Sequence, residues 1–97
     1  MSTYISLLNF TPQGLQGIKD TTKRAEAFKA KAKQKGAALK DVYWTLGEYD
    51  VVAIIEAPND EAVTSLLYDL VAQGNVYTKT LKAFSSQEMS KILSQME

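Results

Sequence analysis

The chain has 97 residues, with 11 Lys and Arg against 11 Asp and Glu, so its formal charge is zero. Its length allows one hydrophobic core, and a hydrophobic fraction of 45% is not that of a disordered chain. Without cysteine or histidine it can form no disulfide, no thiolate or imidazole metal site, and no Ser-His or Cys-His catalytic pair. We therefore expect a single domain over residues 1–97, without a metal or another cofactor.

The N-terminus and the lack of a long apolar stretch predict a cytoplasmic location. Residues 1–10 lack the basic start and the long apolar run of a signal peptide. No stretch approaches the roughly 18 consecutive apolar residues of a membrane span. A nucleic-acid binder usually carries a basic excess to replace counterions, and this chain has none overall. We expect neither nucleic acid nor a membrane as a partner.

The chain opens with a pattern typical of a strand followed by a helix. Residues 4–10 are short, aromatic and β-branched at the start, which favours a strand. Thr11 can cap a helix that has Pro12 at its first position, and Gly36 can end that helix. One amphipathic helix is therefore expected from Pro12 to Gly36. Its apolar face recurs at steps of three and four: Leu15, Ile18, Thr22, Ala25, Phe28 and Ala32.

The other face of this predicted helix is basic. Its charges spread around the helix and are not interleaved with aromatic residues, so we interpret them as solvated side chains rather than a surface for nucleic acid or anionic lipid. The basic residues are Lys19, Lys23, Arg24, Lys29, Lys31, Lys33 and Lys35.

A hairpin follows in the middle of the chain. Residues 39–46 carry Val42, Tyr43 and Trp44 and read as a strand, and residues 51–57 read as another. The short turn between them, residues 47–50, makes the pair antiparallel.

The last third predicts a helix, a strand and a short tail helix. Asn59 can cap the helix, which ends near Gly74, and the strand covers residues 76–84. Ser85 and Glu88 fit a capping box for the tail helix. The order βαββαβ predicts an α+β fold of ferredoxin-like type with an antiparallel sheet and a short C-terminal helix.

Both faces of the predicted sheet are apolar. Val52 and Ile54 point away from the face that carries Val51 and Ile55. Both long helices cover one face of such a sheet, so an apolar second face is unusual for a monomer. We expect a second copy of the chain to cover it, with Val52 and Ile54 in the interface. The alternative is that the tail helix folds back over it.

Loops from three parts of the chain should meet at one edge of this sheet. The end of the first strand with Thr11, the turn with Tyr49 and Asp50, and the start of the last strand fall together because neighbouring strands alternate in direction. Tyr49 could donate a hydrogen bond there, and Asp50 could act as an acid or base. Alternatively, the segment is a glycine-held turn in which Asp50 accepts hydrogen bonds from backbone amides or pairs with a lysine. We favour this structural interpretation.

Two further sets of residues are candidates for a small-molecule site. Asn9, Tyr43 and Trp44 resemble the polar and aromatic lining of a pocket, although large aromatic residues on strands are usually core or interface residues. Glu56 lies in an apolar strand, where burial would raise its pKa and suit it to act as a base. Its alternative role is a strand-end residue paired with a basic group from a partner copy or from a helix.

The segment Trp44 to Val52, continuing to Glu56-Ala57-Pro58, resembles the GYD-domain family. Residues 11–14 and the strand ending at Phe84 support the likeness, which covers nearly the whole chain. The resemblance implies a fold of the dimeric α/β-barrel type. The wider fold includes metabolite-sensing regulatory domains and cofactor-free monooxygenases, but a shared fold transfers neither activity.

These observations favour a homodimeric binding or interaction module without catalysis. One alternative is a cofactor-free monooxygenase- or isomerase-like enzyme that acts on a small aromatic molecule. The other is a regulatory domain that senses a metabolite between subunits.

Overall fold

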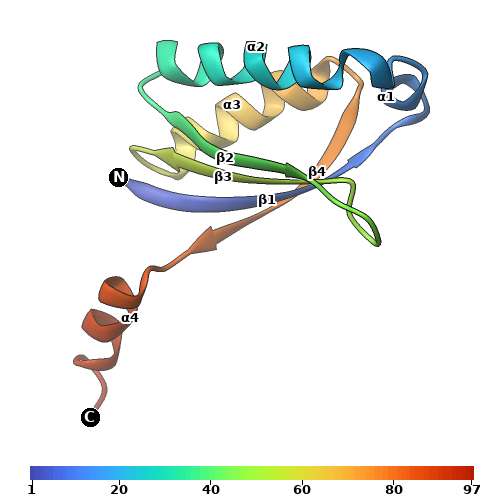
Figure 1. The fold of residues 1–97 in the computed structure, drawn as a ribbon. Coiled ribbons are helices and arrows are strands. Elements are labelled where there is room, and N and C mark those ends of the chain that lie inside the picture. The colour runs from blue at the N-terminus through green and yellow to red at the C-terminus, as the bar shows by residue number, and fades with distance from the viewer.

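The structure is a computed structural model that describes residues 1–97. One antiparallel sheet of order β2-β3-β1-β4 carries the long helices on a single face (Figure 1). The predicted α+β fold of ferredoxin-like type is confirmed. The elements are β1 (Ser2–Phe10), α1 (Pro12–Gln16), a 3₁₀ turn η1 (Ile18–Asp20), α2 (Thr21–Gln34), β2 (Ala38–Trp44), β3 (Val51–Ala57), α3 (Asp60–Ala72), β4 (Val76–Ala83) and α4 (Ser86–Leu93).

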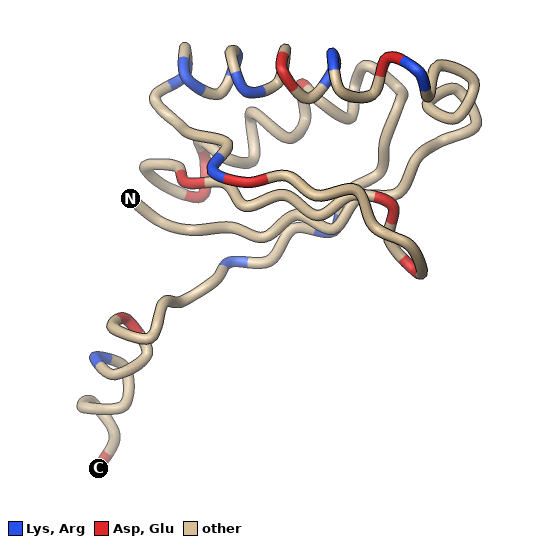
Figure 2. Tube along the Cα trace, in the orientation of Figure 1, with Lys and Arg blue, Asp and Glu red and all other residues tan.

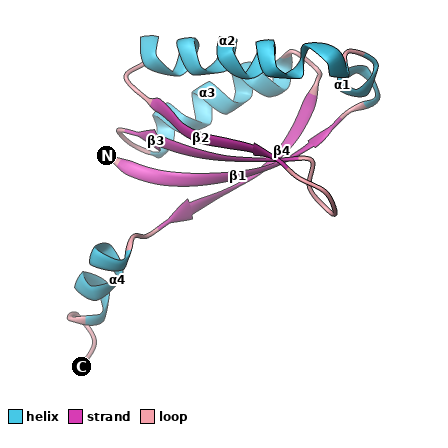
Figure 3. Cartoon of the chain, viewed as in Figure 1, coloured by secondary structure: helices cyan, strands magenta, loops and turns pink.

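The single helix predicted from Pro12 to Gly36 is wrong, because the segment is broken into α1, η1 and α2 (Figure 3). The Arg24 guanidinium of α2 donates hydrogen bonds to the carbonyl oxygens of Gly17 and Gly14. These bonds hold the broken turns against α2. Leu15 and Ile18, expected on the apolar face, are consequently exposed.

The core lies between the sheet and the helices. Every second residue of β3 is buried there, and Ile55 is 1% exposed. Leu66 of α3 and Ala32 of α2 have no exposed surface and close the layer from above. The alternation predicted for β3 is therefore confirmed, because a strand projects successive side chains to opposite faces.

The opposite face of the sheet has no helix over it, and we call it the open face. The register places Tyr43, Val52, Leu7 and Lys79 in one row across the four strands. The next row is Asp41, Ile54, Ile5 and Leu81. A bulge at Lys40 shifts β2 by one residue, which moves Asp41 into this row. The open face is thus apolar at its centre, and the charged side chains of these two rows lie on the edge strands β2 and β4.

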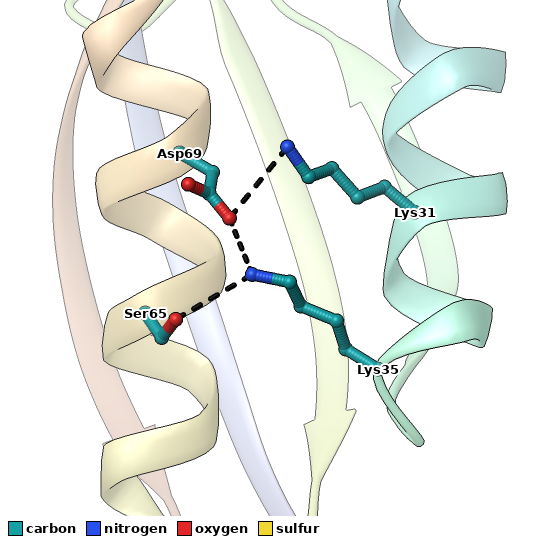
Figure 4. Close-up of polar contacts among 4 residues, drawn as sticks. All are labelled: Lys31, Lys35, Ser65 and Asp69. Atoms are coloured by element: carbon teal, nitrogen blue, oxygen red, sulfur yellow. Dashed lines mark hydrogen bonds and ion pairs between the residues drawn. The ribbon is translucent and has the colours of Figure 1, made fainter.

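A charged clasp joins the two long helices. The Nζ atoms of Lys31 and Lys35 on α2 both approach the Asp69 carboxylate of α3, the first at 3.6 Å (Figure 4). Lys35 Nζ also lies 3.5 Å from Ser65 Oγ. The two lysines hold the pKa of Asp69 below its usual 3.8, mainly through the hydrogen bond from Lys35. The clasp fixes the spacing of the two helices above the sheet.

Helix α4 projects away from the domain, on the side of the sheet opposite to α2 and α3 (Figure 1). Every residue from Phe84 to Glu97 is exposed. The radius of gyration is 14.6 Å, against about 12.5 Å for a compact chain of this length. The alternative in which the tail helix folds back over the open face is therefore not what the structure shows. None of the helices has the length and apolar character needed to cross a membrane.

Candidate functional site

A cavity of about 70 Å³ lies between the helices and the sheet. Thirteen of its eighteen lining residues are hydrophobic. They come from every strand of the sheet and from α2 and α3, so the fold as a whole shapes the cavity. The aromatic side chains that line it are Phe10, Phe28 and Trp44.

Four of the five polar residues that line this cavity have side chains hydrogen-bonded to the protein. Ser6 Oγ is buried and lies 2.8 Å from Thr80 Oγ1, which in turn lies 2.9 Å from Thr78 Oγ1. The Arg24 guanidinium bonds backbone carbonyls, and Trp44 Nε1 donates to Thr21 Oγ1 at 3.1 Å. The cavity therefore offers shape and apolar contact more than free hydrogen-bonding groups.

The three residues predicted to furnish one pocket lie on two faces of the sheet. Trp44 pairs with Val51 on the helix-covered side and lines the cavity. Tyr43 pairs with Val52 on the open face, and Asn9 lies on that same face opposite Tyr77. The structure thus brings Trp44 to the cavity but not Asn9 or Tyr43, and Tyr49 does not line it either.

The turn between β2 and β3 is held by Asp50. Its Oδ2 accepts a hydrogen bond from the Phe10 backbone N–H at 2.9 Å, and its own N–H donates to the Leu8 carbonyl. Asn9 Nδ2 donates to the Glu48 carbonyl at 2.9 Å, and Gly47 has a φ of +120°, a conformation that favours glycine. This geometry supports the structural interpretation of the turn.

The predicted convergence of loops at this edge is visible in the contacts of Thr11. Its hydroxyl donates to the Gly74 carbonyl and accepts from the Gly14 N–H at 3.0 Å, so Thr11 caps α1 and ties it to β4. The backbone of Gly14 packs so closely that a Cβ atom would lie 2.1 Å from the Asn75 carbonyl oxygen. The edge is a tightly packed junction.

Glu56 is not buried. It faces the open side of the sheet, its side chain is 38% exposed, and its Oε1 lies 4.0 Å from Lys40 Nζ. The burial on which its role as a base depended is absent. The nearby basic group is a lysine of the neighbouring strand β2, not one from a helix as the alternative expected.

One buried titratable residue was missed by sequence reasoning. Tyr4 is 3% exposed, and its hydroxyl donates a hydrogen bond to Asp60 Oδ1, which also lies 3.3 Å from Lys82 Nζ. Burial raises the pKa of Tyr4 above 10.0, and the Asp60 bond adds to the effect. The bond from Tyr4 and the contact with Lys82 lower the pKa of Asp60. The only local signal in the sequence was the acidic start of α3. Tyr4, the hydrogen-bond partner of Asp60, lies 56 residues away along the chain.

An antiparallel sheet of order β2-β3-β1-β4 with two long helices on one face, and an apolar cavity between the layers, defines an α+β protein of ferredoxin-like type. Within this class, the chain belongs to the GYD domain family, whose model matches residues 4–93. The family resemblance of the sequence is thereby confirmed.

Comparison with solved structures finds the crystal structure of TTHA0845 from Thermus thermophilus. The two proteins share 26% sequence identity with a TM-score of 0.49, over 89% of this chain and 96% of the other. No curated protein matches the chain.

Proposed function

We propose that this protein is a homodimeric binding module whose two copies stack through the open faces of their sheets. The observation that carries the proposal is the apolar centre of that face. Ile5, Leu7, Val52 and Ile54 form a contiguous block on the two central strands, with no helix over them. Burying such side chains contributes about 25 cal/mol per Å² of apolar surface.

The size of the open face supports a specific partner. Four strands about 4.8 Å apart and about seven residues long give a flat footprint of about 500 Å². The apolar block at the centre of the face takes up part of this footprint, and the largest apolar patches on monomers, about 300–600 Å², are often functional.

The polar side chains of the open face also suit a second copy. Asp41 and Glu56 lie on β2 and β3, whereas Lys79 lies on β4, at the other side of the sheet. A twofold axis that runs along the strands between two facing sheets brings β4 of one copy over β2 of the other. Opposite charges then lie on facing sides, which is the self-complementarity that a symmetric interface requires.

Sedimentation tests this proposal at micromolar protein. The unchanged chain is expected at twice 10.7 kDa, and Val52→Lys or Ile54→Lys at 10.7 kDa. Thr64→Lys, on the exposed side of α3, adds the same charge elsewhere and should leave the dimer intact. A mass near 10.7 kDa for the unchanged chain overturns the proposal.

The cavity favours a second function, the binding of a small apolar molecule. A dry cavity of about 150 Å³ accommodates benzene, so about 70 Å³ suits a short alkyl chain or part of an aromatic ring. In this proposal the cavity binds its ligand without transforming it, because Ser6 and Arg24 are committed to protein partners. Turnover of a small aromatic compound, lost in folded Trp44→Ala, would instead favour an enzyme.

Ligand binding can be measured by titrating the protein with indole or butanol and following amide chemical shifts. Ala25→Leu fills the cavity wall and should weaken binding, whereas Ala27→Leu, exposed on the same helix, should not. Shifts of the same size in both variants would place the ligand elsewhere.

A further inference from the structure

Helix α4 presents an apolar stripe to solvent. Met89, Ile92 and Leu93 follow the spacing i, i+3, i+4 that puts side chains on one face of a helix, and Met96 follows just after the helix ends. They are 38–71% exposed, and Phe84, in the link before the helix, is exposed as well. A complete capping box formed by Ser85 and Glu88 starts the helix. We call residues 84–97 the arm.

A helix this short requires a surface to pack against. Isolated helices of fewer than about 12–15 residues are marginal in water, and their stability in proteins comes from packing of the apolar face. The α4 helix has eight residues, and its hydrogen bonds stay within the arm. The surface that it needs is therefore not supplied by its own chain.

A groove of suitable character runs along the edge of the same fold. It lies between α2 and the edge strand β2 and has a volume of about 440 Å³. Its apolar residues are Ala25, Leu39, Val42 and Trp44, which also line the internal cavity. Four of the ten residues that line the groove are therefore apolar, and they form a wall in common with the cavity.

The charges of groove and arm are opposite. Lys23, Lys29 and Lys40 border the groove, against the acids Glu26 and Asp41. The arm carries Glu88 and Glu97 against Lys91 alone. Figure 2 shows basic positions with acidic ones among them along α2, and both acidic and basic positions on the arm. An arm placed in the groove would gain apolar burial together with a favourable, salt-screened attraction.

We propose that the arm of one copy docks in the α2/β2 groove of a second copy. This inference rests on the proposed dimer, whose twofold axis brings the end of β4 to the start of the partner's β2. The register supports that placement, because Ala83 and Ala38 end the same row across the sheet. The arm then begins beside the partner's edge strand, on the open-face side where it already lies (Figure 1).

The area of the interface agrees with this arrangement. Stable interfaces bury about 800 Å² on each partner, and the open face alone has a footprint of about 500 Å². When each copy docks its arm in the groove of the other, two helix-in-groove contacts flank the central contact between the sheets. An arm seated beside Trp44 also closes one side of the cavity.

Disulfide trapping tests the docking, since the chain contains no cysteine of its own. Met89→Cys on the stripe is mixed with affinity-tagged Glu26→Cys at the groove, each in the full chain. Gln87→Cys, on the opposite side of α4, is the matched control. Docking raises the effective concentration of the whole arm to about millimolar, but only Met89→Cys faces the groove, so it should form the mixed disulfide at least about tenfold faster than Gln87→Cys.

The outcomes separate the arm from the dimer. Equal trapping rates, while sedimentation still gives a dimer, overturn the docking and leave the sheet interface standing. A monomer by sedimentation overturns both. A chain that carries both Met89→Cys and Glu26→Cys and closes within itself, as a reducible monomer, shows that the arm folds onto its own groove and also overturns the proposal.

Discussion

The two faces of the sheet are built from the same strands, but helices cover only one of them. On the helix-covered face, Ile55 and its neighbours lie under α2 and α3, and the clasp at Asp69 holds those helices together. On the open face, Ile54 projects from the same strand with no helix over it. The difference shows that strand sequence alone supplies two apolar faces, and that the surrounding elements decide which one becomes the core.

Truncating adjacent residues of β3 tests this difference between the two faces most directly. Ile55→Ala should lower the free energy of unfolding by about 2–5 kcal/mol, because it leaves a cavity in a closed core. Ile54→Ala should cost about 1 kcal/mol or less in dilute protein, where no partner covers the site. Urea unfolding at several protein concentrations measures both. Equal losses at low concentration would show that the open face is already covered within the chain.

A second variant probes the junction that ties α1 to β4. Gly14→Ala should cost about 1–3 kcal/mol, because the new Cβ atom overlaps the Asn75 carbonyl and backbone must move. Gly17→Ala is the matched control, since its Cβ would meet only the end of the Arg24 side chain at 3.0 Å. Thermal unfolding should separate the two, and a Gly14→Ala protein as stable as the control contradicts the close packing.

The buried tyrosine gives the helix-covered face a dependence on alkaline pH. The folded state raises the pKa of Tyr4, so its contribution is complete below pH 10.0 and is lost as the pH rises through the folded value. Tyr4→Phe should cost about 1 kcal/mol near pH 7 through the lost hydrogen bond. It should also reduce the fall in stability above pH 10.0. Urea unfolding from about pH 7 to about pH 11 checks both, with the exposed Tyr68→Phe as the control.

The smallest effect is expected at the clasp between α2 and α3. The pKa of Asp69 is lowered in the folded state, so its contribution is present above 3.8 and is lost as the pH falls through the folded value. Asp69→Asn should therefore flatten the acid side of the stability profile slightly, and added salt should weaken the effect. Asp20→Asn, at an exposed carboxylate outside any ion pair, should leave the profile unchanged.

Much of the fold was predictable from local signals. The caps Thr11, Asn59 and Ser85 act at the predicted helix starts, and the alternation of β3 matches its burial. These features depend on neighbours a few residues apart. The break at Gly17, between α1 and α2, was missed because the apolar residues keep their steps of three and four through it.

The candidate site was harder to predict for the same reason. The side chains of Asn9, Tyr43 and Trp44 are of the kinds that line pockets. Successive residues of a strand point to opposite faces of the sheet, however, so Tyr43 and Trp44 lie on different sides of it. The hydrogen bond between Tyr4 and Asp60 joins residues 56 positions apart and has no local signature.

The only tryptophan of the chain stands where the internal cavity meets the edge groove. Trp44 is 41% exposed, so its fluorescence responds to whatever replaces water there. A blue shift of the Trp44 emission on addition of a small molecule indicates binding in the cavity. A blue shift on raising the protein concentration indicates contact with a neighbouring copy. The native protein thus carries an optical probe for both events without any label.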